Sequence, residues 1–243
     1  MKIILYSILL LVMLTGMVSC KKDNYDAPGS QLTGRIVYQG EAINVEYNQV
    51  PYQLYQYGFG KVGPIGAGYG GYTGTNTTFA PDGSFSCLLY DGEYKFLIPN
   101  GQGPFLWKKL PSGDPDTITI NLSGSKDLDV EVTPYYMIRT PNIAAGGGKV
   151  SGSFKIEKII TGVDAKDVES VALYINKTTF VSGANNVASA SVNGASIADP
   201  NNVQLEVTVP TLTPTQNYVF ARIGLKISGV EDRIFSPVVK VQL

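Results

Sequence analysis

The chain has 243 residues, of which 44% are hydrophobic and 16% charged, so it has enough apolar side chains to build packed cores. Its 19 basic and 20 acidic residues give a formal net charge of −1, and its longest basic runs are pairs such as Lys21-Lys22. This excludes nucleic acid as an expected partner, because phosphate binding requires a concentrated basic face. The chain contains no histidine, which excludes Ser-His and Cys-His nucleophile pairs and the commonest metal ligand.

The first twenty residues have the pattern of a secretory leader. Lys2 precedes an apolar stretch over residues 3–14, which is shorter than the about 20 residues of a membrane span. The segment MVSC at residues 17–20 resembles the lipobox of bacterial lipoproteins, with Met17 where Leu is usual. The resemblance implies a signal peptide over residues 1–19 and acylation of Cys20, which becomes the mature N-terminus. We therefore expect a lipid-anchored protein of the outer membrane, on either its cell-surface or its periplasmic face.

A short spacer precedes the first domain. Residues 20–30 carry the lipidated cysteine, charge, Pro and Gly but few apolar side chains, which is typical of a flexible tether. From Gln31 onward, short segments rich in β-branched and aromatic residues alternate with turn signals such as Pro81-Asp82-Gly83 and Asn100-Gly101. No window has a sustained helical period. We predict a β-sandwich over residues 31–133, with strands at 32–38, 50–57, 75–79, 84–89, 93–98, 117–122 and 126–132.

A second all-β domain is predicted for residues 134–243. Val132-Thr133-Pro134 marks the boundary, because proline removes a ladder hydrogen bond and restricts the residue before it. Gly146-Gly147-Gly148 offers an alternative boundary ahead of the first long strand. We predict strands at 149–158, 168–175, 203–209, 218–227 and 235–241.

Two neighbouring segments suggest a family. The sequence TFAPDGSF at residues 78–85 and LYDGEYKF at residues 89–96 resemble the carboxypeptidase-regulatory-like, transthyretin-like domain, in which the aromatic residues face the core. With LTGRI at 32–36, NGQGPF at 100–105 and VTPY at 132–135, the chain is similar to a domain-of-unknown-function family of Bacteroidetes lipoproteins. That resemblance implies SusC/SusD-type glycan-uptake proteins as partners, and it brings no catalytic residues.

The second domain also contains one segment that resembles a known family. The sequence LTPTQNYVFAR at residues 212–222 resembles the tyrosine corner of fibronectin type III and immunoglobulin-like sandwiches. In those domains a tyrosine at the start of a strand, here Tyr218, hydrogen-bonds back to the preceding turn. The resemblance implies an immunoglobulin or fibronectin type III-like second domain.

Aromatic residues gather in a glycine-rich part of the first domain. Six of the fifteen tyrosines lie between residues 47 and 72, and Tyr52 and Leu54 share one strand face while Tyr55 and Tyr57 share the other. Exposed rings suit sugars, whose C–H faces stack on a ring while their hydroxyls hydrogen-bond to nearby amides. The same rings could instead cover a core or contact a protein partner. The candidate glycan-binding residues are Tyr55, Tyr57, Tyr69, Tyr72 and Trp107.

Carboxylates are the remaining candidates for catalysis or metal binding. Asp127, Asp129 and Glu131 share one strand face, which is typical of a solvated face and would also suit calcium. Two facing carboxylates can hydrolyse glycosides, and the candidates for such a pair are Asp82, Asp91, Glu93, Asp114, Asp116, Asp127, Asp129 and Glu131. Cys87 is predicted to be a small buried residue on the same strand face as Phe85.

Together these patterns favour a non-enzymatic envelope lipoprotein without cofactor or metal. Its expected role is an accessory glycan-binding component of a polysaccharide-utilisation system. A structural or assembly protein that binds another envelope protein is the alternative, and a carboxylate-based hydrolase is a third possibility that needs two facing acids in a cleft.

Overall fold

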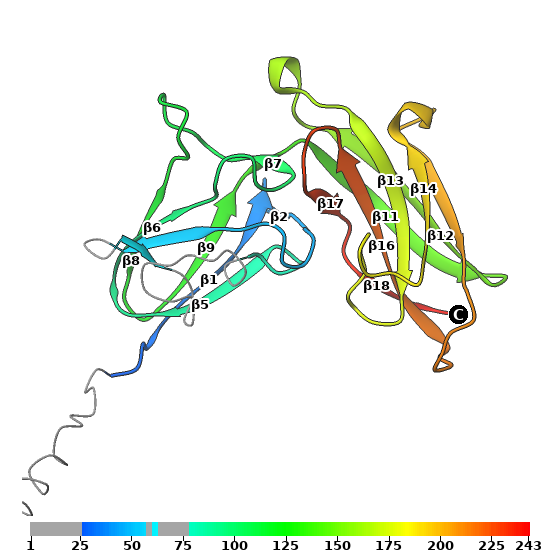
Figure 1. The fold of residues 1–243 in the computed structure, drawn as a ribbon, viewed down its shortest axis with the longest axis horizontal. Coiled ribbons are helices and arrows are strands. Elements are labelled where there is room, and N and C mark those ends of the chain that lie inside the picture. Colours follow the sequence, from blue (N-terminus) through cyan, green and yellow to red (C-terminus); the bar gives the residue numbers. More distant parts are fainter. Residues whose placement is uncertain (1–25, 57–59, 63–77) are drawn as a thin grey trace, which may run out of the picture.

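The computed structural model describes residues 26–56, 60–62 and 78–243, which form two all-β domains in tandem (Figure 1). The predicted fold class, two successive β-sandwiches, is confirmed. The predicted signal peptide, Cys20, Tyr57, Tyr69 and Tyr72 lie outside the described residues. Within those residues, no helix has the length and hydropathy needed to cross a membrane.

The first domain consists of two packed sheets. In one sheet β1 lies between β9, which runs parallel to it, and β5, and β2 also pairs with β1. The other sheet has the antiparallel order β4-β3-β6-β8. The strands are β1 (Ser30–Tyr38), β2 (Glu41–Ala42), β3 (Gln53–Gln56), β4 (Gly60–Val62), β5 (Ser84–Leu89), β6 (Gly92–Leu97), β7 (Phe105–Leu106), β8 (Ile118–Leu122) and β9 (Ser125–Glu131).

Aromatic side chains fill the core between these sheets. Tyr52 stacks on Phe96 with the ring centroids 5.3 Å apart, and Phe79 and Phe85 pack against both rings. Cys87 is 1% exposed, with its Sγ 3.0 Å from the Tyr52 hydroxyl. The prediction of a buried cysteine is therefore confirmed, as is the alternation that turns Phe85 and Cys87 inward.

The second domain is a sandwich of antiparallel sheets. One sheet has the order β11-β12-β15, and the other has the order β14-β13-β16-β17 with β18 also paired to β16. Ahead of them β10 (Thr133–Pro134) pairs with β7 at the junction of the domains. The elements are β11 (Tyr136–Gly146), β12 (Lys149–Lys158), η2 (Gly162–Asp164), β13 (Val168–Asn176), β14 (Ala188–Asn193), η3 (Gly194–Ser196), β15 (Val203–Thr208), β16 (Tyr218–Ile227), β17 (Arg233–Phe235) and β18 (Val239–Gln242).

Some features of the second domain differ from the predictions. Strands β11 and β14 have no predicted counterpart, and the predicted strand 235–241 is interrupted between β17 and β18. Around Tyr218 the described residues provide no hydrogen bond from its hydroxyl to the preceding turn. Its ring instead lies 3.9 Å from Lys240 Nζ and beside Phe220, so the predicted tyrosine-corner hydrogen bond is wrong.

A buried arginine joins the two domains. Arg222 on β16 is 2% exposed and lies 4.1 Å from the Phe235 ring centroid. Its Nε donates to Ser236 O at 2.8 Å, and its Nη2 donates to Val45 O at 3.0 Å and to Pro81 O at 2.9 Å. The last two carbonyls belong to the first domain. Burial lowers the pKa of Arg222 to about 10, against the attraction of nearby carboxylates, so the group remains cationic at neutral pH.

Further polar contacts join the two domains. The amide of Phe235 donates to Asn44 O at 3.0 Å, and the amide of Gly103 donates to Asp232 Oδ2 at 2.7 Å. Arg139 forms an ion pair with Glu41 of the first domain. Because these bonds cross from one domain to the other and several are buried, the pair of sandwiches is held in one relative orientation.

Candidate functional site

The structure describes only part of the predicted tyrosine site. Tyr52, just before β3, and Leu54 on β3 are buried, and Tyr55 lies on the other face, half-buried, as the alternation predicts. The Tyr55 hydroxyl donates to Gln53 Oε1 at 3.0 Å. Because Tyr57, Tyr69 and Tyr72 lie outside the described residues, the structure places Tyr55 alone of this group.

Trp107 belongs to the core of the first domain. Its side chain is 6% exposed, its Nε1 donates to Asp116 O at 2.7 Å, and its ring meets the edge of Phe96 at 6.4 Å. Of its two predicted roles, core cover and exposed platform, the structure gives it the first. Trp107 is therefore not an exposed platform for a sugar, because only a small part of its side chain is accessible.

The acidic row on β9 faces solvent. Asp127, Asp129 and Glu131 are exposed. Asp127 Oδ1 accepts from Thr33 Oγ1 at 2.9 Å, and Glu131 Oε1 accepts from the amide of Gln39 at 2.7 Å. In the part of the chain that the structure describes, no group of three or more His, Cys, Asp or Glu side chains could hold a metal ion. The row therefore acts as a hydrogen-bonded outer strand face.

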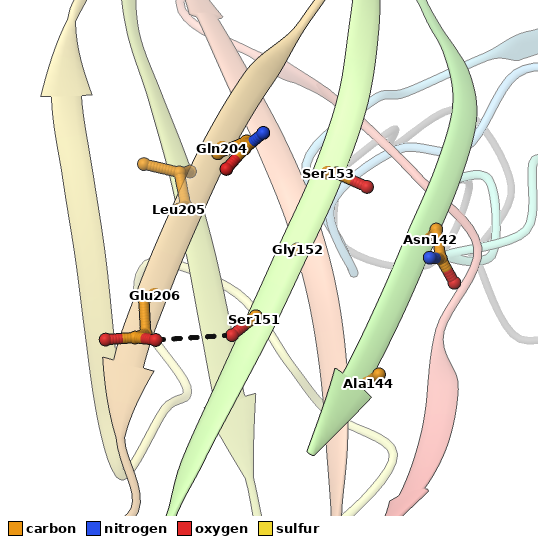
Figure 2. A pocket seen from close by; sticks show the side chains of 8 residues that line it. All are labelled: Asn142, Ala144, Ser151, Gly152, Ser153, Gln204, Leu205 and Glu206. Atoms are coloured by element: carbon orange, nitrogen blue, oxygen red, sulfur yellow. Dashed lines mark hydrogen bonds between the residues drawn. The ribbon is translucent and has the colours of Figure 1, made fainter. Parts of the chain in front are cut away.

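A shallow groove crosses the outer face of the β11-β12-β15 sheet (Figure 2). It is about 240 Å³ in volume, and Figure 2 shows Ser151 directed toward Glu206, whose oxygen lies 3.5 Å from the serine hydroxyl. Glu206 also pairs with Lys149 Nζ at 2.5 Å. No ring lines this groove, so it offers polar contacts without stacking. Its lining residues are Asn142, Ala144, Ser151, Gly152, Ser153, Gln204, Leu205 and Glu206.

A second hollow, about 470 Å³ in volume, opens beside η3 in the second domain. It is lined mainly by aliphatic and small side chains, and its charged residues, Lys158 and Asp167, pair with each other at 3.8 Å. The hydroxyl of Tyr136, also in its wall, donates to Lys166 O at 2.6 Å. The polar groups of this hollow are therefore already satisfied by protein partners, which leaves little to orient a ligand.

A third hollow, which we call the seam pocket, lies between the two domains and is about 210 Å³ in volume. The first domain contributes the chain around β7, which Figure 1 shows at the junction, and the second contributes three short segments. Ligand sites occur preferentially at such domain junctions. Its lining residues are Pro99, Asn100, Gly101, Gln102, Gly103, Phe105, Leu106, Trp107, Lys109, Tyr135, Lys166, Gly229 and Val230.

The local sequence explains the shape of the first wall. Gly101 and Gly103 have φ values of 78° and 81°, which favour glycine. A Cβ at Gly103 would lie 2.3 Å from the Phe105 ring, so only glycine lets that ring fold under the loop. The pairing of β7 with β10, together with a hydrogen bond from the amide of Tyr135 to Pro104 O at 3.2 Å, brings this loop to the second domain.

The seam pocket differs from the hollow beside η3 in its unsatisfied polar groups. The side chains of Gln102, Lys109 and Lys166 have no hydrogen-bond or ion-pair partner among the residues described. Lys166 Nζ lies 5.9 Å from the centroid of the Tyr135 ring, which is 7% exposed. Burial raises the pKa of Tyr135, and Asp164 raises it further, so its hydroxyl remains protonated at neutral pH. The pocket thus combines aromatic walls with free amide and ammonium donors.

None of the three hollows contains two carboxylates. The groove has Glu206, the hollow beside η3 has Asp167, and the described lining of the seam pocket has no acidic side chain. The arrangement that a carboxylate-based hydrolase requires is therefore not found in these three places.

Sequence reasoning missed most of the seam pocket. The segment at residues 100–105 was noted for its turn glycines, and Trp107 for its ring. Tyr135, Lys166 and Gly229 are far from it in sequence, and only the packing of the second domain brings them together.

Family models match both halves of the chain. Residues 30–133 match a model described as "Protein of unknown function (DUF3823) N-terminal domain", and residues 136–240 match "Domain of unknown function (DUF3823_C)". The chain belongs to the DUF3823 family. The predicted assignment to a domain-of-unknown-function family is thus confirmed, whereas its lipid anchor and its SusC/SusD association remain predictions.

Solved structures resemble this DUF3823 chain over most of its length. A DUF3823 family protein from Parabacteroides merdae is 32% identical with a TM-score of 0.72, and one from Bacteroides ovatus is 26% identical with the same TM-score. A protein from Bacteroides uniformis described as a proposed carbohydrate-binding protein is 16% identical with a TM-score of 0.62, which shows a shared fold. Each match covers 89% of this chain and 100% of the other. Comparison with curated proteins gives no match.

Proposed function

We propose that this DUF3823 protein is an envelope lipoprotein that binds a glycan in the seam pocket. The observation that carries the proposal is the combination of aromatic walls with the unpartnered side chains of Gln102, Lys109 and Lys166. The rings of Phe105, Trp107 and Tyr135 are only 4%, 6% and 7% exposed, so they offer the C–H groups of a sugar an apolar wall and not an open stacking face. The hydroxyls of a sugar require hydrogen-bond donors and acceptors, which the polar side chains supply. The description of the Bacteroides uniformis relative as a proposed carbohydrate-binding protein supports the same role.

The size of the pocket limits what it binds. At about 210 Å³ it is smaller than the roughly 300–1,000 Å³ of typical drug-sized ligand pockets. It accommodates one sugar unit, so the protein recognises the end or a side branch of a glycan. Capture of a terminal unit by a protein tethered through Cys20 suits an accessory component of a polysaccharide-utilisation system, with SusC/SusD-type proteins as neighbours.

The experiment is an oligosaccharide array probed with the soluble chain from residue 26 onward. We expect retention by one class of glycan, with about fivefold weaker affinity in the Gln102→Ala variant because one ligand hydrogen bond is lost. Gln204→Ala is the matched control, since it removes the same side chain from the sheet groove and should leave affinity unchanged. Binding that responds to Gln204→Ala and not to Gln102→Ala would move the site to the groove.

The alternative function, binding to another envelope protein, has one supporting observation. Tyr47 of the first domain and Phe180 of the second are both exposed and meet edge to face, with their centroids 5.4 Å apart. Exposed aromatic pairs are common at protein interfaces. Absence of glycan binding by the wild-type chain, together with a specific envelope protein that co-purifies with the lipidated form, would favour this function.

A further inference from the structure

We infer that the seam pocket selects a sugar unit that carries a carboxylate, and that Lys109 and Lys166 bind this carboxylate. The inference rests on the proposed function, because it names the class of sugar for the same pocket. It comes from the charge of the lining residues, which the general argument for glycan binding does not use.

Four other lysines in the described residues pair with an acidic side chain, and several more bond to backbone carbonyls or lie over a ring. Lys95 lies 3.7 Å from Glu93, Lys149 lies 2.5 Å from Glu206, and Lys158 lies 3.8 Å from Asp167. The two lysines of the seam pocket, one from each domain, have no such partner in the described residues. The pocket therefore has two cationic lining residues and no acidic one, which favours an anionic ligand.

Packing positions Lys166 at the pocket. Its Nζ lies near the Tyr135 ring, and a Cβ at Gly229 would be 3.5 Å from it. The backbone carbonyl of Lys166 accepts the hydrogen bond from the Tyr136 hydroxyl, which fixes the segment from behind. Because the residue is half-buried and its stem is constrained, less side-chain entropy is lost when it binds an anion.

Asp232 and Asp164 do not line the pocket. Asp232 is 5% exposed, and its Oδ2 accepts the amide hydrogen of Gly103 beneath the loop. Asp164 on η2 is exposed and does not line the pocket. The surface that a ligand meets therefore presents two ammonium groups and the Gln102 amide.

These side chains imply a ligand with two kinds of group, a carboxylate and a hydroxylated ring. Ammonium groups bind a carboxylate through charge-assisted hydrogen bonds, while Gln102 can bond to ring hydroxyls. The aromatic wall favours a ring with C–H groups, and the volume fits one unit. A terminal uronic or sialic acid has all these features, whereas a simple carboxylate lacks the ring.

The test compares acidic sugars with their uncharged derivatives by NMR titration of the soluble chain from residue 26 onward. The probes are glucuronate, galacturonate and N-acetylneuraminate, the methyl ester of each, the neutral sugars glucose and galactose, and acetate. We expect at least one acid to bind about fivefold tighter than its ester and its neutral sugar, with acetate weaker than the acid. The preference for the acid should decrease as salt is raised.

Two variants assign the preference to the pocket. Lys166→Gln should remove most of the difference between acid and ester while leaving the ester affinity unchanged. Lys155→Gln is the matched control, because Lys155 is an exposed lysine of β12 that also lacks a partner among the described residues. Thermal unfolding of each variant confirms that the fold persists.

The outcomes separate this inference from the proposed function. Equal affinity for acid, ester and neutral sugar would overturn the inference and leave glycan binding intact. Binding of acetate as tightly as of the acidic sugars would overturn it as well, because the pocket would then recognise an anion without its sugar. Binding of none of the probes, together with an empty glycan array, would overturn both.

Discussion

The thiol of Cys87 is buried in the core of the first domain. Burial raises the pKa of its thiol, although the contact with the Tyr52 hydroxyl lowers it, so little thiolate forms at neutral pH. The soluble chain from residue 26 has no other cysteine. We expect a thiol reagent such as DTNB to leave the folded chain unmodified and to label one thiol per chain after unfolding in urea.

A neighbouring residue provides the control for this labelling. Ser86 is exposed on the opposite strand face, so a Ser86→Cys, Cys87→Ala chain should react at once in the folded state. Rapid labelling of native Cys87 would contradict the packing described for the first core.

At the residue scale, sequence reasoning predicts some side-chain positions and not others. Strand alternation correctly predicts that Cys87 is buried with Phe85 and that Tyr52 and Leu54 share a face, but it does not say which face of the second pair is covered. It gives no answer for Trp107, which lies just beyond the short strand β7. Its burial depends on Phe96 and Asp116, which the loop reaches only after folding.

At the scale of elements, Asp91 connects three parts of the first domain. It precedes β6, accepts hydrogen bonds from the Ser30 hydroxyl of β1, and accepts others from Gly124 N at 3.4 Å and Ser123 Oγ at 3.3 Å before β9. The hydrogen bond from Ser30 is the main reason that the pKa of Asp91 is lowered, and the Gly124 amide adds to it. The ionised form is thus favoured in the folded state.

The pH dependence of stability follows from the lowered pKa of Asp91. A carboxylate whose pKa is lower in the folded state stabilises the fold above its unfolded pKa of about 3.9, and this stability is lost as pH falls through the folded pKa. We expect Asp91→Asn to lower the thermal midpoint at pH 7 and to reduce the loss of stability below about pH 4. Circular dichroism melts from pH 2.5 to 7 test this.

The control for this prediction is Asp129→Asn, which removes an exposed carboxylate that has no hydrogen bond within the described chain. It should melt like the parent at every pH. If Asp91→Asn and the parent showed the same pH profile, the three-way contact at Asp91 would not stabilise the ionised form.

Secondary structure was predictable where strands are regular and apolar on one face. The bounds of β5, β12 and β16 match the predicted segments. By contrast, β11 has a bulge between Arg139 and Asn142, with Thr140 at a φ of 46°, so its side-chain alternation is interrupted. The edge strand β14 alternates small and polar residues, and its pairing with β13 is visible only in the fold.

At the scale of the whole molecule, the candidate site depends on how the two domains are joined. No single segment encodes the seam pocket, because its walls come from residues 99–109, 135, 166 and 229–230. Propensity and periodicity describe neighbours in sequence, and they contain no information on which loops meet across a domain junction. The charge pattern that distinguishes Lys109 and Lys166 therefore emerges only once the domains are packed together.

A substitution at Arg222 can test whether the two domains stabilise each other. Its guanidinium belongs to the second domain but is hydrogen-bonded to two carbonyls of the first. Arg222→Met would leave two buried acceptors, Ser236 O and Val45 O, without their donor, whereas Pro81 O keeps the amide of Val45. At roughly 1–3 kcal/mol for each unsatisfied group, we expect the free energy of unfolding to fall by about 2 kcal/mol or more. Arg222→Lys should restore only part of this, because one ammonium cannot reproduce the spread of a guanidinium stacked on Phe235.

The chain contains one tryptophan, Trp107, so its fluorescence reports on the first domain alone. In urea, Arg222→Met should lower the midpoint of the Trp107 transition even though the substitution lies in the other domain. Arg35→Met, on an exposed arginine of β1, is the matched control and should leave that midpoint nearly unchanged. An unaltered Trp107 transition in Arg222→Met would mean that the domains unfold independently, and that the seam between them is not held by this buried cation.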